Sequence, residues 1–355
     1  MKSILTDSYA IHFNSDAYRE MNTYLKTNRF SKLFIIVDTN TNEYCLPKFL
    51  PYLETQCDIE IIEIEAGEEH KTIDTCLGVW NTLSELGADR KSLIINLGGG
   101  VITDLGGFVA STFKRGIKYI NIPTSRLAMV DGSVGGKNGV DLGTLKNQIG
   151  VINSGELVLI DTQYLDTLPQ NHLKSGMAEM LKHGLISDRA YWEKLSDLSK
   201  LTLDDLDQLI YDSVIIKKEI VDRDPYEMND RKFLNFGHTL GHAIESHFLS
   251  DVDKVELLHG EAIAVGMILE SYLSSKLLNF PETDCDQIKK VMLNLFKKVD
   301  ISLKDQNEII ELLKYDKKNE HGNINFVLLE AMGKPKADCL VDNTLIFEAF
   351  KYYSD

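Results

Sequence analysis

The 355-residue sequence predicts two domains: an α/β N-terminal domain built on a parallel sheet and a mostly α-helical C-terminal domain. Two observations predict this organisation. In the first half, short continuous apolar runs alternate with segments of helical period, as in βαβ units. From about Pro169 onward the helical period dominates and strand-like runs become few. We therefore predict a boundary near residue 168, which separates domains 1–168 and 169–355.

The predicted strands of the first domain are runs rich in Ile, Leu and Val that end at a turn-forming residue. Continuous apolar runs of this length are typical of parallel strands buried on both faces. The runs cover residues 33–37, 93–97, 119–122 and 157–160, and they end before Asp38, Gly98, Pro123 and Asp161. Between the first two runs, apolar residues recur at helical spacing from Ile73 to Leu83, and Gly87 closes the predicted helix.

The second domain opens with a predicted helix that carries an apolar stripe. The stripe consists of Leu173, Met177, Met180, Leu181 and Leu185. These residues recur at three- and four-residue intervals, so they share one face of a helix. The same period continues through most of the remaining sequence, which predicts a helical domain.

The charge balance argues against a nucleic-acid partner but is compatible with a small phosphate-bearing ligand. The chain has 38 basic and 54 acidic residues, a net charge of −16, so a nucleic-acid partner is not expected. A local lysine cluster can still hold a phosphate inside an acidic protein. We expect no membrane span and no signal peptide, because the long apolar stretches that they need are missing. Five scattered cysteines predict a reduced, cytoplasmic protein.

The segment Gly98-Gly99-Gly100 follows a predicted strand and precedes a predicted helix. Glycines let the backbone approach a ligand, and the helix start offers N–H groups and partial positive charge to a phosphate. This arrangement predicts a Rossmann-like nucleotide site. The spacing is not GxGxxG, so a mere tight turn is an equal alternative. Asp38 is a candidate for ribose hydroxyls, and the alternative is that it caps a turn.

Five of the nine histidines lie between residues 183 and 259. His238 and His242 are one helical turn apart and share a face, so both are candidate metal ligands. Thr239 stands where a zincin helix requires glutamate. His259 and Glu179 complete the set, because a carboxylate in an apolar helix is costly unless it is paired or binds metal. Imidazoles with one carboxylate form an ordinary Zn²⁺ site, although each residue alone is more often structural.

Several lysines occupy positions that favour an anion pocket over a solvated surface. Lys137 lies in the glycine-rich segment from Val130 to Gly139, which we interpret as a phosphate-binding loop. Lys182 lies one turn after Glu179 on the same predicted helix. The alternative is that these lysines are simply solvated, as most lysines are.

Taken together, these motifs resemble 3-dehydroquinate synthase over nearly the whole chain. Their order and spacing are more specific than any one of them. The matching segments are residues 66–71, 98–104, 122–124, 130–140, 146–150, 176–184, 231–245, 258–261 and 316–318.

The resemblance implies which residues bind the cofactor and the metal. It assigns the NAD site to Asp38, Glu68, Lys71, Gly99, Gly100, Val101, Ile102, Thr103, Asp104, Thr124, Ser125, Lys137, Lys146, Tyr164, Leu165, Asp166 and Thr167. It assigns the metal, normally Zn²⁺ with Co²⁺ as a substitute, to Glu179, His238 and His259. His242 is then left beside the reacting centre rather than on the metal.

The resemblance also implies which residues contact the substrate. Lys137, Asn147, Lys182 and Asn235 match residues around the substrate phosphate, and Lys217 and Arg231 match carboxylate and hydroxyl contacts. Asp131 is counted with these catalytic residues. Arg115 matches a residue that reaches the phosphate of the neighbouring subunit, which implies a homodimer. One lysine of Lys317-Lys318 should also face the substrate.

The implied reaction converts 3-deoxy-D-arabino-heptulosonate 7-phosphate into 3-dehydroquinate and phosphate, in the shikimate pathway. It proceeds by transient oxidation with NAD, phosphate elimination, reduction, ring opening and intramolecular aldol closure. Three alternatives remain open: another sugar-phosphate cyclase, a metal-dependent alcohol dehydrogenase of the glycerol-dehydrogenase type, and a non-catalytic NAD-responsive module.

The sequence departs from the family pattern near the predicted site, where Ser125 keeps the hydroxyl of the usual threonine and other positions, including 126 and 138, also differ. Arg126 replaces an apolar residue close to the cofactor segment, which puts the local packing in question. Asn138 stands directly after Lys137, where threonine is usual.

Overall fold

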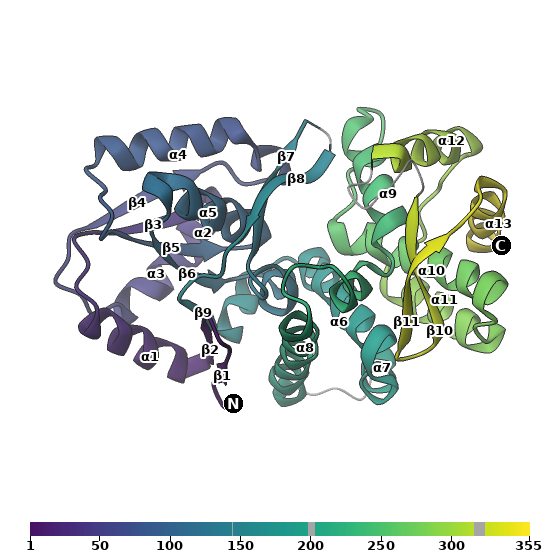
Figure 1. Cartoon of the computed structure of the whole chain (residues 1–355), viewed down its shortest axis with the longest axis horizontal. Helices are drawn as coiled ribbons and strands as arrows, with labels where there is room; N and C mark the ends of the chain where they lie inside the picture. Colours follow the sequence, from purple (N-terminus) through teal and green to yellow (C-terminus); the bar gives the residue numbers. More distant parts are fainter. Residues whose placement is uncertain (144, 198–202, 316–323) are drawn as a thin grey trace. The chain divides into compact units, whose positions relative to one another are not determined.

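The computed structural model of the protein describes residues 1–143, 145–197, 203–315 and 324–355. The chain forms two compact units, of which the first contains Met1–Leu173 and Asp207–Ile215 and the second contains Lys174–Leu206 and Ile216–Asp355. The sequence places its boundary near residue 168, and the observed contacts put residues 169–173 and 207–215 with the first unit. Figure 1 labels the elements of both units.

The first unit is built on a mainly parallel sheet, as the sequence predicts. In its described residues the sheet has seven strands in the order β1-β2-β9-β6-β5-β3-β4, with only the β1–β2 pair antiparallel. The four predicted strands are β3, β5, β6 and β9. Their bounds are Leu33–Asp38, Leu93–Gly98, Lys118–Pro123 and Leu157–Ile160.

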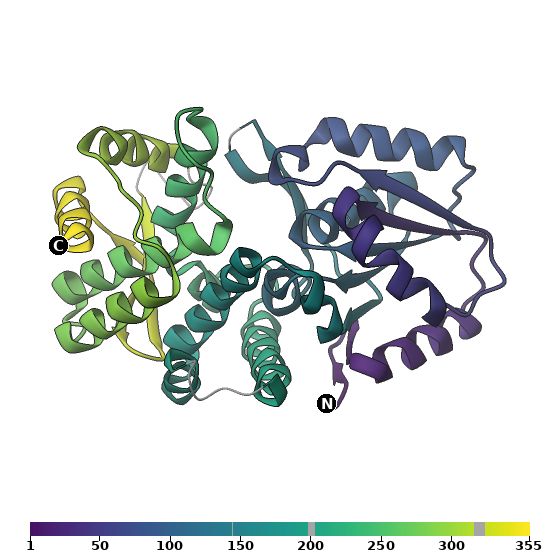
Figure 2. The ribbon, with the colours of Figure 1, turned by 180° about the vertical axis from the view of Figure 1, so that it is seen from behind.

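The sheet is covered on both faces, which explains why its central strands read as continuous apolar runs. On one face, α4 and α5 bury residues such as Val79 and Leu105 against Phe34 and Ile94 of the sheet. Helix α1 lies on the opposite face, as Figures 1 and 2 show from the two sides. With helices on both faces, a ligand of such a sheet binds outside the carboxyl ends of its strands.

The remaining elements of the first unit connect these strands or extend them. The strands are β1 Ile4–Leu5, β2 Ala10–Phe13, β4 Ile59–Ile64, β7 Lys137–Leu142 and β8 Leu145–Ile152. The helices are α1 Asn14–Thr27, α2 Thr39–Tyr44, α3 Leu46–Phe49, η1 Leu50–Tyr52, η2 Glu68–His70, α4 Ile73–Glu85, α5 Gly100–Thr112, η3 Phe113–Arg115, η4 Ala128–Gly132 and η5 Thr162–Thr167.

Strand β7 corrects one detail of the sequence interpretation. Lys137 was predicted to lie in a glycine-rich loop, but it is the first residue of β7, which pairs with β8 as an antiparallel hairpin. Glycine at position 139 faces Gly150 across this hairpin, and a side chain at either position would collide with the opposite backbone. Of the glycines that suggested a loop, Gly139 therefore serves close strand pairing, whereas Gly135 and Gly136 precede the strand with positive φ values of 97° and 68°.

The second unit is mostly helical, which confirms the predicted fold class. Its helices are α6 Gln170–Ser187, α7 Arg189–Ser196, α8 Leu203–Arg223, η7 Asp230–Asn235, α9 His238–Ser250, α10 His259–Leu278, α11 Glu282–Leu295, α12 Leu303–Leu312, η8 Leu313–Tyr315 and α13 Asn343–Ser354. Helix α10 is its centre and packs against α9, α11, α13 and a strand hairpin. The hairpin strands are β10 Asn325–Ala331 and β11 Lys334–Leu340. Across the described residues, every helix is too short or too polar to cross a membrane.

Candidate active site

The predicted cofactor residues of the first unit follow the carboxyl ends of five neighbouring strands. These are Glu68 and Lys71 after β4, Asp38 at the end of β3, Gly99–Asp104 after β5, Thr124 and Ser125 after β6, and Tyr164–Thr167 after β9. The chain leaves β3 toward β4 on one side and leaves β5 toward β6 on the other. The switch point between β3 and β5 is where open α/β sheets bind ligands.

Helix α5 presents its first turn at this switch point. Gly99 is its N-cap and, among the described residues, no side-chain hydrogen bond caps this end of the helix. The side chains of Ile102 and Thr103 are fully buried, and the Thr103 hydroxyl donates to the Gly99 or Gly100 carbonyl at 3.2 Å. The Thr103 backbone N–H already donates to the Gly99 carbonyl at 3.0 Å. Of these two residues, only Ile102 lies among the first backbone N–H groups of the helix, which lack a helical partner and suit a phosphate.

Asp38 acts as a helix cap in this structure. Its Oδ1 accepts a hydrogen bond from the Thr41 backbone N–H at 2.7 Å and one from the Thr41 hydroxyl at 3.0 Å. The Oδ1 atom of Asp38 therefore caps helix α2, which is the structural alternative to a role in ribose binding. A role toward ribose hydroxyls stays a prediction.

A buried lysine joins two of the predicted cofactor segments. The Lys71 ammonium donates to Asp104 Oδ2 and to Asn147 Oδ1, both at 2.7 Å, and only 4% of the residue is exposed. Burial would lower the pKa of Lys71, but the carboxylates of Asp104 and Glu68 raise it above its usual range. Lys71 is therefore a fixed positive charge that ties the start of α5 to the β7–β8 hairpin.

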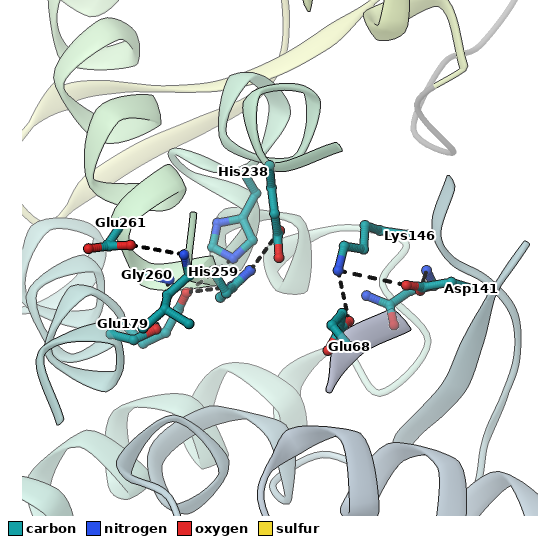
Figure 3. Close-up of polar contacts among 12 residues, drawn as sticks. Glu68, Asp141, Lys146, Glu179, His238, His259, Gly260 and Glu261 are labelled. Carbon is teal, nitrogen blue, oxygen red and sulfur yellow. Dashed lines mark hydrogen bonds and ion pairs between the residues drawn. The ribbon is translucent and has the colours of Figure 1, made fainter. Parts of the chain in front are cut away.

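Asp141 is a residue of this cluster that the sequence reasoning missed. Its Oδ1 accepts the Asn147 backbone N–H at 2.6 Å, and its Oδ2 lies 3.7 Å from the Lys146 ammonium. Lys146 also pairs with Glu68 at 2.9 Å (Figure 3). Burial raises the pKa of Asp141, against the opposing effect of Lys71 and Lys146. Asn147 adopts a positive φ of 52° within β8, and its hydrogen bond to Asp141 holds this part of the hairpin in place.

In the second unit, Glu179 lies on α6 and is completely buried. An isolated carboxylate in such a position costs several kcal/mol. Its Oε1 is 3.3 Å from His238 Nε2 and 3.3 Å from His259 Nε2 (Figure 3). Its Oε2 lies against the Lys182 ammonium. The three predicted metal ligands therefore converge on one point from α6, α9 and α10.

The two distances that join Glu179 Oε1 to the histidine Nε2 atoms fit a metal ion. Two atoms bonded to a tetrahedral zinc at about 2.0–2.1 Å lie about 3.3 Å apart. Both distances from Glu179 Oε1, 3.3 Å each, agree with this tetrahedral edge. The residues present thus fit a divalent cation held by one carboxylate and two imidazoles.

Both histidines are oriented by a partner on the other ring nitrogen. His238 Nδ1 lies 3.0 Å from the Phe236 carbonyl, and His259 Nδ1 lies 3.1 Å from Glu245 Oε2. A donor at Nδ1 leaves the Nε2 lone pair directed at the metal position. Glu245 was not among the predicted site residues. Its position one turn after His242 on α9 was a signal, but its partner lies on another helix.

The pKa values show how the cluster distributes charge. Burial alone would raise the pKa of Glu179, but Lys182 and His238 hold it well below its usual range. Burial lowers the pKa of His238 to about 4, and the Lys182 charge acts in the same direction. Burial would also lower the pKa of His259, but Glu245 and Glu179 raise it to about 10. The cluster therefore combines the charged carboxylate of Glu179, the neutral imidazole of His238 and, at His259, surroundings that favour a positive charge.

His242 lies beside the trio, and the geometry still admits it as a ligand. Its ring centroid is 5.1 Å from that of His238 and 5.7 Å from that of His259, and the ligand atoms of the three rings lie within 4.8 Å of one another. The 3.3 Å contacts of Glu179 favour the carboxylate as the third ligand. His242 is half-buried, so its ring can face both the cluster and a substrate.

The other predicted substrate residues of the second unit are buried and polar. Lys182, Lys217 and Arg231 are at most 6% exposed. Arg231 Nη1 donates to the Pro225 carbonyl at 2.5 Å, and the Asn235 amide donates to Glu227 Oε1 at 2.9 Å. Lys317 and Lys318 lie outside the described residues.

Arg115 lies near the amino end of strand β6, whereas the cofactor residues follow the carboxyl ends of the strands. It precedes β6, is exposed, and lines a cavity of about 680 Å³ together with Arg29, Arg90 and Lys118. Lys114 and Arg115 adopt φ values of 48° and 71°, which is costly for non-glycine residues. Arg115 is thus held away from the cofactor edge of its own unit.

The departures from the family pattern at positions 126 and 138 are accommodated by hydrogen bonds. Arg126 is buried, and its Nη1 donates to the Leu173 carbonyl at 2.9 Å. The Asn138 amide donates to the Asn153 carbonyl at 2.7 Å and to the Tyr119 hydroxyl at 3.0 Å. Both residues therefore serve packing in the first unit. Asp131 and Lys137 are half-buried, and their role toward substrate stays a prediction.

Comparisons with known proteins agree with this arrangement. The family models "3-dehydroquinate synthase N-terminal" and "3-dehydroquinate synthase C-terminal" match residues 61–175 and 176–319. A 3-dehydroquinate synthase of Parabacteroides distasonis is 41% identical over 344 residues, which cover 96% of each chain.

Two solved structures share the fold along nearly the whole chain. One is 2-deoxy-scyllo-inosose synthase with carbaglucose-6-phosphate, NAD⁺ and Co²⁺, at 28% identity, a TM-score of 0.84 and 99% coverage of both chains. The other is 2-epi-5-epi-valiolone synthase of Streptomyces hygroscopicus with NAD⁺ and Zn²⁺, at 24% identity, a TM-score of 0.83, and 100% and 99% coverage. With two family models and a relative of this identity matched along its length, the chain belongs to the 3-dehydroquinate synthase family.

Proposed function

We propose that this protein is a 3-dehydroquinate synthase, which converts 3-deoxy-D-arabino-heptulosonate 7-phosphate into 3-dehydroquinate and phosphate in the shikimate pathway. Family membership supports the reaction, and one observation in the structure carries its chemistry. Glu179 Oε1 lies 3.3 Å from both His238 Nε2 and His259 Nε2, in a cluster that fits a divalent cation. A cyclase that oxidises a substrate alcohol needs such a cation beside the reacting carbon.

The cofactors are NAD and a divalent metal, with zinc as the resident ion and cobalt as a substitute. The inosose synthase with this fold holds NAD⁺ and Co²⁺ in its solved structure, which supports both assignments. When bound, NAD takes up and returns a hydride and the cation polarises substrate oxygens. The switch point between β3 and β5 is proposed for NAD, and the trio on α6, α9 and α10 for the cation.

Lys137, Asn147, Lys182 and Asn235 are proposed as contacts of the substrate phosphate. Lys182 is 1% exposed, so its ammonium is desolvated and interacts strongly with a second anion. Lys217 and Arg231 are assigned to the substrate carboxylate and hydroxyls, because buried cationic donors suit these groups.

His242 is proposed to hold and move the proton of a substrate hydroxyl. We expect His242→Gln to keep one metal ion per chain and to lower kcat by about 10²–10⁴-fold, because general acid–base catalysis contributes that much. Metal analysis and steady-state kinetics on the same preparation check both parts. Loss of the metal in this variant would instead make His242 a ligand.

The protein is proposed to act in the cytoplasm as a homodimer, with Arg115 serving the substrate phosphate of the partner. Arg115 lies near the amino end of strand β6, away from the cofactor residues, and its costly backbone conformation supports a dedicated role. We expect sedimentation analysis at working concentration to give the mass of two chains. A single-chain mass would contradict this assignment.

The proposed function is tested by incubating purified protein with the heptulosonate phosphate, NAD⁺ and Zn²⁺. We expect stoichiometric release of phosphate and 3-dehydroquinate, with no net NADH, because the hydride is returned in each turnover. Net NADH formation from simple polyols would indicate a dehydrogenase. Absence of phosphate release would contradict the proposal.

A further inference from the structure

Helix α10 carries a second buried glutamate whose role the proposed reaction does not explain. Glu270 has no exposed surface and follows the apolar stretch Ala262–Leu269, except for Gly266. A carboxylate in such surroundings must be compensated by hydrogen bonds or charge. Glu270 is eleven residues from His259, about three turns along the helix, so it does not lie at that ligand.

Glu270 binds the first turn of the neighbouring helix α9. Its Oε2 accepts a hydrogen bond from the Gly237 backbone N–H at 2.6 Å, and its Oε1 accepts one from the Leu240 N–H at 3.2 Å. Gly237 is the N-cap of α9 and has no side chain of its own to cap the helix. Glu270 therefore supplies the cap from another helix, and its negative charge faces the positive end of the helix dipole.

The capped turn is the turn that presents His238. This residue is the first of α9, between the two backbone amides that Glu270 holds. Its ring is aimed by its Nδ1 contact with the carbonyl of Phe236, the residue directly before the Gly237 N-cap. Any tilt of this turn changes the direction of His238 Nε2 relative to Glu179.

Helices α9 and α10 pack so closely that the first turn of α9 has little space to move. Gly237 has a φ of 78°, and a side chain there would lie 2.4 Å from Met267 Cγ. At Gly266, a side chain would lie 2.0 Å from the Gly237 carbonyl oxygen. The glycines thus allow the two helices to pack closely, and the Glu270 hydrogen bonds fix the orientation of the first turn of α9.

We infer that Glu270 is a positioning residue, which fixes the first turn of α9 so that His238 Nε2 points at the metal position. This inference rests on the proposed metal site formed by Glu179, His238 and His259. It differs from a purely structural role in one respect. Metal affinity should depend on the hydrogen-bonding capacity of residue 270 beyond its effect on overall stability.

The test is a titration of purified, metal-free protein with Zn²⁺ and with Co²⁺ for the wild type, Glu270→Gln and Glu270→Asp. Glutamine keeps the shape but places an amide donor against a backbone N–H. We expect about a 10–100-fold weaker affinity and an altered Co²⁺ absorption spectrum, as for other residues that orient metal ligands. Aspartate keeps the charge but is shorter, so we expect an intermediate affinity.

A matched control separates positioning from stability. Ile288→Ala, at a buried position on α11, is expected to lower the melting temperature and leaves the Glu270 hydrogen bonds to α9 in place. We expect it to bind Zn²⁺ within about twofold of the wild type. If affinity follows melting temperature alike in all variants, or if Glu270→Gln binds normally, the inference is wrong. If Glu270→Gln does not fold, the same comparison between Glu270→Asp and Ile288→Ala decides.

A further variant distinguishes this inference from the proposed function. His238→Ala should lose the metal if the proposed site is right. Failure of the wild type to bind metal, or retention by His238→Ala, would overturn the metal site itself. Loss in His238→Ala together with normal binding in Glu270→Gln would overturn only the role of Glu270.

Discussion

Replacing Glu179 by glutamine is expected to abolish stoichiometric metal binding and to lower kcat by at least about 10³-fold. Glu179 Oε1 is the atom that both histidine Nε2 nitrogens face at 3.3 Å, and an amide oxygen is a weak ligand for zinc. A metal that polarises substrate oxygens supplies several kcal/mol, and each 1.36 kcal/mol is a factor of about ten in rate. Metal content and turnover of the folded variant check this result.

The same change should also destabilise the metal-free protein, because the buried Lys182 would lose its ion pair with Glu179. Folding must therefore be verified by circular dichroism before the metal is measured. Glu261→Gln is a matched control, since Glu261 caps α10 through the Leu258 N–H and glutamine can do the same. We expect the control to keep metal and activity. A folded Glu179→Gln protein with one tightly bound metal per chain would contradict the assignment.

The second large effect is expected from Gly260→Ala, at the start of α10. A Cβ at this position would lie 2.1 Å from the Ser175 carbonyl oxygen and 2.5 Å from Ser175 Cα (Figure 3 shows the glycine beside His259). Both obstacles are backbone atoms of α6, so the two helices must separate. Overpacking of this kind costs about 1–3 kcal/mol, which corresponds to a drop in melting temperature on the order of 5 °C.

The separation of α6 and α10 should also damage the metal site. His259 is adjacent to Gly260 and Glu179 lies on α6, so a shift of a few tenths of an ångström breaks their 3.3 Å contact. We expect at least a tenfold loss of metal affinity, measured by competition with a chelator. Gly78→Ala on α4 is the matched control, because a side chain there meets nothing within 4 Å and alanine favours the helix. Equal metal affinity in both variants would refute the predicted link between helix spacing and metal binding.

Much of the first unit follows from local sequence patterns. The apolar runs that end at Asp38, Gly98, Pro123 and Asp161 correspond closely to strands β3, β5, β6 and β9. A strand buried on both faces must be apolar along its length, so its ends are marked by the first polar or turn-forming residue. The carboxyl edge that gathers the predicted cofactor residues could therefore be located from the sequence.

The contacts that orient these residues could not be predicted in the same way. Asp141, Glu245 and Glu270 each act on a partner in another segment of the chain. Whether a carboxylate faces a backbone N–H or a histidine depends on how two elements approach each other. Periodicity determines only which face of a helix or strand a residue occupies.

The two histidines on one face of α9 show the same limit. Spacing makes His238 and His242 equal candidates, and only the resemblance to a family separates them. In the structure, His238 Nε2 lies 3.3 Å from Glu179 Oε1, whereas His242 lies beside the rings of its neighbours. The direction of each ring is set by contacts such as that of His238 with Phe236, which spacing alone cannot reveal.

The most direct test of the account is the position of the metal itself. Anomalous diffraction at the zinc edge, from crystals grown with NAD⁺ and Zn²⁺, locates the ion without reference to the protein atoms. We expect one peak at about 2.0–2.1 Å from Glu179 Oε1, His238 Nε2 and His259 Nε2, with His242 outside bonding distance. A peak bonded to His242 in place of Glu179, or no peak near these residues, would contradict the account.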